Sequence, residues 1–174
     1  NCTSTIRKII KNISPTSFKG KMDNGAVIKL NMHYDKKIKK LLINFHGYGD
    51  CANAYSENIG NFYALNNLAD DEGFLIAYPQ AMIREKGDPY WEPGDIGSDI
   101  AINDVKFARR IVSDIESKLQ IEIEKTFAVG FSNGGMMAYD LACTASDVFE
   151  SVAGMSGVRL DGVCSDSISK SILH

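Results

Sequence analysis

Short apolar runs alternate with longer amphipathic stretches along most of the chain. Runs rich in β-branched and aromatic residues predict strands at 26–32, 41–45, 74–78, 126–131 and 151–156. A shorter strand is expected near Phe18, and residues 172–174 have the pattern of the start of another. Apolar residues at helical spacing predict helices over 54–72, over 98–120 and after Ser132, and Gly73 is expected to end the first of them.

Strands that alternate with helices predict an α/β fold, with a mostly parallel sheet and helices on both faces. The near-continuous apolar run at 41–45 indicates a central strand that is covered on both sides. Right-handed crossovers bring the loops after parallel strands to one edge of the sheet, where ligands usually bind. We therefore expect His46-Gly47-Tyr48, the long loop 80–97 and Ser132 to converge at that edge.

The stretch 126–139 carries the most specific signal. A strand-like run meets the turn Gly130-Phe131-Ser132-Asn133-Gly134, and an alanine- and methionine-rich helical pattern follows. This strand–turn–helix context is the one that a Gly-x-Ser-x-Gly nucleophile elbow requires. Strand and helix approach closely there, so glycine is needed at 130 and 134, and Ser132 is raised on a strained turn. The start of the helix directs backbone N–H groups and a positive dipole end at the same place.

Composition excludes several function classes. The chain has 174 residues, 44% of them hydrophobic and 24% charged, with a net charge of −3, which suits one globular domain. Nucleic acid is not an expected partner, because the one basic run, 36–40, is typical of a solvated turn between strands. No apolar run is long enough to span a membrane. Neither Gly-x-Gly-x-x-Gly nor a phosphate-binding loop occurs, and no cofactor is expected.

Four cysteines are present without any Cys-x-x-Cys pair: Cys2, Cys51, Cys143 and Cys164. This arrangement argues against a zinc site and favours two disulfides in an oxidising compartment; four reduced thiols in a cytosolic enzyme are the alternative. Three connectivities are possible. We prefer the one that joins Cys143 to Cys164 and Cys2 to Cys51, and further partners could come from sequence outside the chain.

The first residues also favour the secretory pathway. Sequons at Asn1 and Asn12 would accept glycans in a eukaryotic secretory pathway, although such short motifs also occur by chance. The chain begins at Asn1 rather than Met, so a processed or trimmed polypeptide is expected. Together with the cysteine usage, these features predict a secreted, extracellular glycoprotein.

Four segments share a further pattern, and together they span about residues 40–157. They are Asn44-Phe45-His46-Gly47-Tyr48-Gly49, the run from Leu68 to Gln80, Asn103-Asp104-Val105-Lys106-Phe107, and the run from Gly130 to Cys143. The set resembles the α/β-hydrolase superfamily. More narrowly, it resembles the secreted esterases that include polyhydroxybutyrate depolymerase-like proteins and feruloyl or acetylxylan esterases.

The resemblance implies roles for individual residues. Ser132 would be the nucleophile, and the backbone N–H groups of Tyr48 and Asn133 would form the oxyanion hole. His46 and Trp91 are candidates for substrate contact; the alternatives are that His46 supports the turn and that Trp91 packs its loop. The expected substrates are carboxylic esters of feruloyl, acetyl-xylan or hydroxyalkanoate type, in plant polysaccharide or as short acyl esters.

The same fold places a catalytic acid and a histidine after the serine, and the sequence offers no good candidate for either. The histidines are His33, His46 and His174, and the later acidic residues Asp161 and Asp166 precede the last predicted strand. We therefore expect residues 1–174 to be the N-terminal portion of a single α/β-hydrolase domain. Its C-terminal strands, acid and histidine would lie in a second chain after nicking, in a further stretch of the protein, or be lost by truncation. The isolated chain should then hydrolyse esters negligibly.

Two other functions fit the same scaffold. A serine peptidase or acyltransferase would use the same elbow on a different bond, since substrate choice depends on loops. A catalytically inactive carbohydrate- or ligand-binding protein would keep the fold without an activated serine. Among the remaining residues, Met136 and Met137 are expected to fill the core, and Asp104 either ties its helix to a neighbouring loop or faces solvent.

Overall fold

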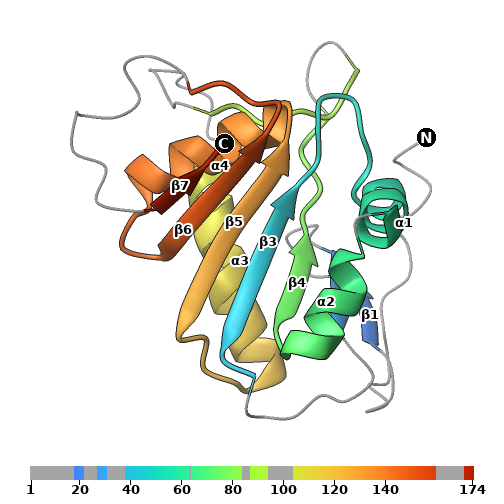
Figure 1. Cartoon of the computed structure of the whole chain (residues 1–174), viewed down its shortest axis with the longest axis vertical. Coiled ribbons are helices and arrows are strands. Elements are labelled where there is room, and N and C mark those ends of the chain that lie inside the picture. The colour runs from blue at the N-terminus through green and yellow to red at the C-terminus, as the bar shows by residue number, and fades with distance from the viewer. Residues whose placement is uncertain are drawn as a thin grey trace.

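The computed structural model describes residues 18–21, 27–30, 38–62, 64–83, 87–93, 104–159 and 171–174. Within these ranges a single sheet has the strand order β1-β2-β4-β3-β5-β6-β7 (Figure 1). The strands are β1 (Phe18–Lys21), β2 (Val27–Leu30), β3 (Lys40–Phe45), β4 (Leu75–Tyr78), β5 (Lys125–Phe131), β6 (Phe149–Met155) and β7 (Ser171–Leu173). β2 pairs antiparallel with β1 and β4, and the strands from β4 to β7 are parallel. The predicted mostly parallel α/β sheet is confirmed.

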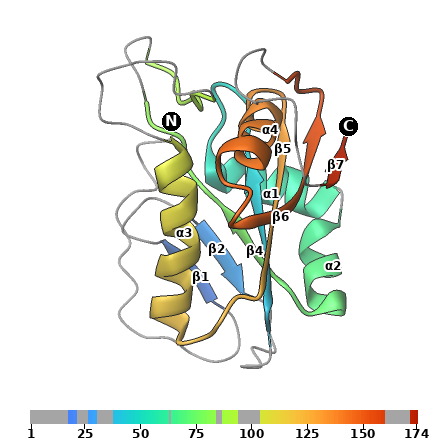
Figure 2. The same ribbon diagram turned by 90° about the vertical axis from the view of Figure 1, so that its left-hand side faces the viewer.

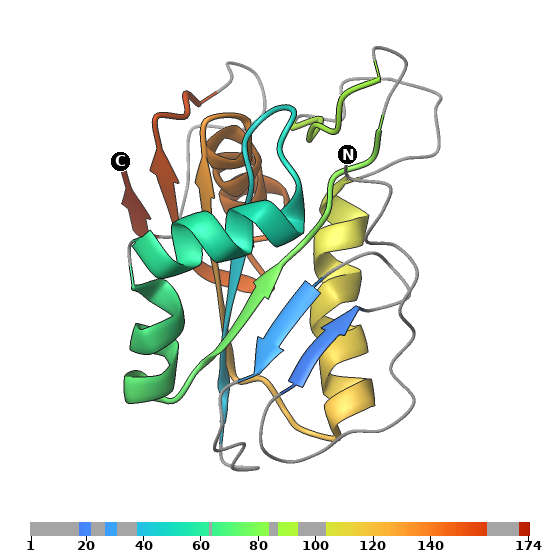
Figure 3. The ribbon, with the colours of Figure 1, turned by 90° about the vertical axis from the view of Figure 1, so that its right-hand side faces the viewer.

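The described helices cover both faces of this sheet. They are α1 (Ala52–Phe62), α2 (Leu65–Glu72), α3 (Asp104–Leu119) and α4 (Asn133–Thr144). Figures 2 and 3 show α1 and α2 on one side of the sheet and α3 and α4 on the other. None of these helices is both long and apolar enough to cross a membrane.

The side chains of β3 and β4 point alternately to the two faces of the sheet, and each face has its own hydrophobic core. Leu41, Ile43 and Phe45 are fully buried in the larger core, with residues of α3 and α4. Leu42 packs instead against the smaller core, which includes Ile76 together with residues of α1 and α2. Because successive strand residues point to opposite faces, a strand buried on both sides must be apolar at nearly every position. The sequence prediction of a central, doubly covered strand at 41–45 is therefore confirmed.

The predicted single helix over 54–72 is two helices. α1 ends at Phe62, and Ala64 adopts a left-handed conformation with φ 52° before α2 begins. The apolar spacing continues across this break, no proline marks it, and Gly60 lies within the last turn of α1, so periodicity joined the two helices. Gly73 does end α2 as expected, with φ 65° and its N–H donated to the carbonyl of Ala69.

Candidate active site

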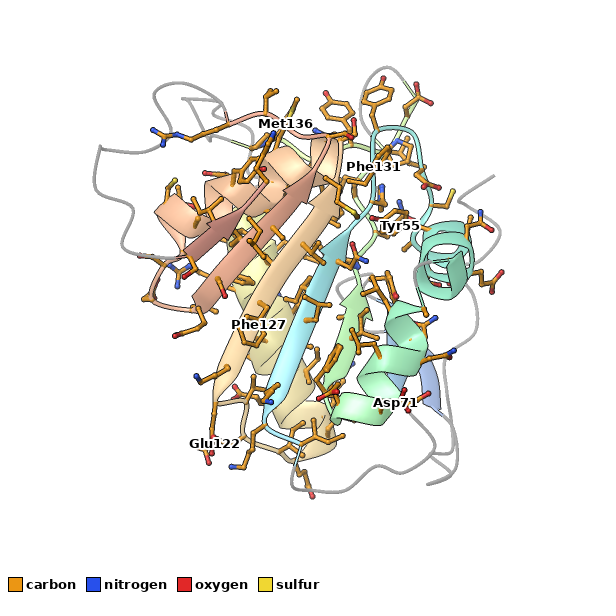
Figure 4. All side chains as sticks on the ribbon, in the orientation of Figure 1. Tyr55, Asp71, Glu122, Phe127, Phe131 and Met136 are labelled. Atoms are coloured by element: carbon orange, nitrogen blue, oxygen red, sulfur yellow. The ribbon has the colours of Figure 1, made fainter. Side chains whose placement is uncertain are left out.

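Ser132 occupies the turn between β5 and α4 in a strained backbone conformation. Its φ is 51° and its ψ is −116°, a combination that side-chain-bearing residues rarely adopt. The Ser132 N–H donates to the carbonyl of Met155 over 2.8 Å, and the Met136 N–H donates to the carbonyl of Ser132 over 3.1 Å. The turn is thus held from both β6 and α4. Phe131 and Met136, which flank it, are labelled at this end of the sheet in Figure 4.

The two glycines of the motif allow this close approach. A Cβ atom on Gly130 would overlap the carbonyl group of Gly134, and one on Gly134 would lie 2.6 Å from the His46 carbonyl oxygen. No side chain fits either place, since the neighbours are backbone atoms that cannot rotate away. The glycine requirement predicted at 130 and 134 is confirmed, and α4 begins in contact with the end of β3.

The segment after β3 runs beside the serine turn. β3 pairs with β5 in a register that sets Phe45 opposite Gly130, and a Cβ on Gly47 would lie 3.3 Å from the Phe131 ring. Tyr48 follows at this edge, with 52% of its surface exposed. The Tyr48 ring stacks on Tyr90 at 5.5 Å. The predicted convergence of this segment and the serine turn at one sheet edge therefore holds in the structure.

His46 is fully buried, and its hydrogen bonds are those of a neutral imidazole, in which one ring nitrogen donates and the other accepts. Nδ1 donates to the Gly47 carbonyl over 2.7 Å, and Nε2 accepts from the Ala81 N–H over 3.1 Å and faces the Gln80 amide nitrogen at 3.3 Å. Burial lowers the pKa of His46, a shift that its bond to Gly47 opposes only in part. With no exposed surface and its free lone pair occupied, His46 has no face open to a substrate and instead supports the turn. The predicted substrate contact is corrected accordingly.

Trp91 is also buried, with 1% of its surface exposed. Its ring meets Phe45 edge-on at 5.1 Å and stacks on Phe107 at 6.2 Å. The indole Nε1–H donates to the His46 carbonyl over 2.9 Å. A ring enclosed in this way cannot stack on a substrate, so the predicted contact role is corrected to packing of the loop against β3 and α3.

The Asn133 side chain has a role that sequence reasoning missed. Its Oδ1 accepts from the Trp91 N–H over 2.8 Å, and its Nδ2 donates to the Trp91 carbonyl over 2.9 Å. The two residues are 42 positions apart, and no periodic pattern could reveal this pairing. Nearby, Asp104 accepts from the Glu92 N–H over 2.8 Å, which confirms the tie between its helix and a loop.

His174 lies at the end of β7 and contacts α4. Its Nδ1 shares a 2.5 Å hydrogen bond with the Tyr139 hydroxyl, and the two rings stack at 5.9 Å. Cys51 and Cys143 are both disulfide-bonded, but their partners fall outside the described residues, so the preferred pairing stays a prediction. The other residues singled out from the sequence also lie outside the described ranges: Asn1, Cys2, Asn12, His33, Asp161, Cys164 and Asp166.

Comparisons with known proteins find relatives named as esterases. No protein-family model matches the chain. The chain is 34% identical over 119 residues to the putative esterase NocK of Nocardia uniformis subsp. tsuyamanensis, a match that covers 68% of the chain and 33% of that protein. It is 39% identical over 150 residues to the probable feruloyl esterase C of Aspergillus clavatus, covering 80% of the chain and 51% of that protein.

Solved structures give the same fold. An acetyl xylan esterase from Aspergillus awamori has a TM-score of 0.58 at 17% identity, covering 88% of the chain and 55% of the esterase. A Bacillus cereus carboxylesterase has a TM-score of 0.59 at 15% identity, covering 84% of the chain and 67% of the carboxylesterase. The chain has the α/β-hydrolase fold, and these sequence relatives are named as esterases. It spans about a third to a half of the length of the first curated relatives that it matches.

Proposed function

We propose that the chain is part of a serine hydrolase that cleaves carboxylic esters through an acyl-enzyme on Ser132. The observation that carries this proposal is the backbone of Ser132, held at φ 51° between β5 and α4 beside the segment that ends in Tyr48. A strained conformation of this kind persists only where the surrounding structure enforces it, and such residues cluster at active sites. The esterase relatives support the same reading.

The chemistry would proceed in two steps. The Ser132 Oγ attacks the ester carbonyl carbon while its proton passes to a histidine, and the alcohol leaves with that proton as the acyl-enzyme forms. Water then attacks the acyl-enzyme while one of its protons passes to the histidine, and that proton is donated to the Ser132 Oγ as the carboxylic acid leaves. In both steps the negative charge on the carbonyl oxygen would be met by the backbone N–H groups of Tyr48 and Asn133.

The histidine and acid are proposed to lie in the longer protein of which these 174 residues are the N-terminal portion of one domain. His46 has its free ring nitrogen occupied, and His174 is bonded to the Tyr139 hydroxyl. In this fold both groups follow the serine along the chain. The curated relatives are two to three times as long as the segment that they share with this chain, which leaves room for both. A separate second chain has no support from the comparisons.

The substrate is proposed to be a feruloyl, acetyl-xylan or hydroxyalkanoate ester, because relatives with similar sequence carry feruloyl esterase names. Exposed apolar side chains follow three strands at the site: Tyr48 after β3, Met82 and Ile83 after β4, and Phe131 at the end of β5. An apolar rim suits a hydrophobic acyl group better than it suits a charged one.

We further propose that the protein is secreted. Both described cysteines are disulfide-bonded, which suits an oxidising compartment. Cys51 directly precedes α1 and Cys143 lies near the end of α4, so disulfides there would fasten both helices that border the site. Glycans at Asn1 and Asn12 belong to the same proposal.

The test compares the full-length protein with its Ser132→Ala variant on methyl ferulate, acetylated xylan and a short p-nitrophenyl ester. The proposal expects turnover of at least one ester by the parent and a fall of about 10⁴-fold or more in the variant. Equal turnover by both proteins would contradict it. A folded parent that neither turns over an ester nor reacts with a fluorophosphonate would favour the binding-protein alternative.

A further inference from the structure

The Asn133 carboxamide makes a two-point contact with the loop after β4. Its oxygen and nitrogen engage the N–H and the carbonyl of the same residue, Trp91, over 2.8 and 2.9 Å. A primary amide offers one acceptor and one donor side by side, which matches a single residue's backbone in an extended segment. Leucine offers neither group, and an ionised aspartate offers acceptors only.

Trp91 carries this contact on to the segment after β3. Its indole N–H donates to the His46 carbonyl over 2.9 Å, in the peptide that precedes Gly47 and Tyr48. The ring is fixed by Phe45 on its edge and Phe107 on its face, and it is 1% exposed. Because the buried ring is packed on two sides, a shift of the Trp91 backbone would also shift the His46 peptide to which the indole is bonded.

We propose that Asn133 is a positioning residue whose side chain holds the two oxyanion donors, its own N–H and that of Tyr48, at a fixed separation through Trp91. The proposal rests on the proposed function of Ser132 and goes beyond it, because it gives the carboxamide a role distinct from that of the Asn133 backbone. Among the described residues, further links between the two segments include the backbone contacts at Gly134 and the contact of Gly47 with Phe131. Those contacts set how closely the segments approach, while the carboxamide would set their orientation.

The test uses the full-length protein with Asn133→Leu and Asn133→Asp, and with Asn67→Asp as the matched control. Asn67 is exposed on α2, at a distance along the chain from every residue of the contact. We expect Asn133→Leu to lower kcat by about 10²-fold while KM stays within about twofold, since the donors serve the transition state more than the ground state. Asn67→Asp should keep both parental values.

Asn133→Asp adds a readout that a purely structural role would not move. At alkaline pH the carboxylate that this variant carries at position 133 has no proton to donate to the Trp91 carbonyl oxygen, so one of the two hydrogen bonds is lost. The kcat of this variant should then fall by at least about tenfold. At acidic pH the protonated carboxyl group again offers one donor and one acceptor, so the ratio of variant to parental kcat should rise as the pH falls.

The results separate the positioning role from the proposed function. A pH-independent ratio for Asn133→Asp, or a change in KM in place of kcat, overturns the positioning role. Parental kcat in a folded Asn133→Leu protein overturns it too, and if that variant does not fold, the Asn133→Asp series decides alone. A parent without esterase activity refutes the proposed function itself, whereas an active parent with unaffected Asn133 variants refutes only this inference.

Discussion

Gly134, the second residue of α4, lies directly against the carbonyl groups of Phe45 and His46 at the end of β3. The Ser132 turn and the segment that leads to Tyr48 are therefore in backbone contact, although Gly134 and Tyr48 are 86 positions apart in the sequence. This contact is what makes two remote motifs a single site, as Figure 1 shows for the adjacent ends of β3, β5 and α4.

Gly134→Ala is predicted to disrupt that contact. The added Cβ would lie 2.6 Å from the His46 oxygen and closer still to that of Phe45, so β3 and α4 must separate. We expect a loss of about 3 kcal/mol in the free energy of unfolding, together with loss of Ser132 reactivity. Urea unfolding measures the first and fluorophosphonate labelling the second. Gly73→Asn, at an open left-handed helix end, is the control and should cost about 1 kcal/mol or less. Parental stability in Gly134→Ala would show that the contact is looser than described.

The strain at Ser132 predicts an increase in stability on replacement by glycine. Glycine adopts φ 51° without the Cβ penalty that both serine and alanine incur. Ser132→Gly should therefore unfold with a free energy about 1 kcal/mol higher than Ser132→Ala, and both variants should be inactive. Thermal or chemical denaturation of the two variants supplies the comparison. If Ser132→Gly is the less stable of the two, the turn is not strained at this residue.

His46 predicts a particular dependence of stability on pH. Burial lowers its pKa below the ordinary value of 6.5, so the unfolded chain binds the proton at a higher pH than the folded protein. The stabilising contribution is complete above pH 6.5 and is lost as the pH falls toward the folded-state pKa, with a slope of up to about 1.4 kcal/mol per pH unit. The free energy of unfolding of the parent and of His46→Gln should be measured between about pH 7.5 and about pH 5. Only the parent should show this slope. Identical slopes would mean that His46 is not held neutral.

Disulfide connectivity gives a prediction that does not depend on catalysis. Cys51 and Cys143 are both bonded, and we expect Cys2 as the partner of Cys51 and Cys164 as the partner of Cys143. Peptide mapping under non-reducing conditions identifies the linked pairs. A peptide that joins Cys51 to Cys143, or joins either one to a cysteine elsewhere in the longer protein, would overturn the pairing.

The sequence was sufficient where one local pattern decides the structure. Each of two local patterns fits one conformation: the apolar run at 41–45 fits a buried strand, and the glycines at 130 and 134 fit a tight turn. β3 and the serine turn are found as predicted. The break between α1 and α2 was missed, because Ala64 takes a left-handed conformation that its side chain does not favour. Residues of α1 and α2 pack in one core with Ile76 and Tyr78, and periodicity cannot reveal such packing.

The site was predictable in position and less so in role. Ser132 and Tyr48 could be placed at one edge because both follow predicted parallel strands, whose carboxyl ends lie along the same edge of the sheet. Trp91 was expected to offer its ring to a substrate, yet three neighbours enclose it and its N–H is used by His46. Burial of a loop residue depends on what lies across from it, and the partners of Trp91 come from β3, α3 and α4.

The most direct test of the central claim is where a covalent probe attaches. Full-length protein treated with a fluorophosphonate, digested and analysed by mass spectrometry should carry the adduct on Ser132, and labelling should cease in Ser132→Ala. An adduct on a different residue of a protein that hydrolyses esters would contradict the account, because the nucleophile would then lie outside the β5–α4 turn.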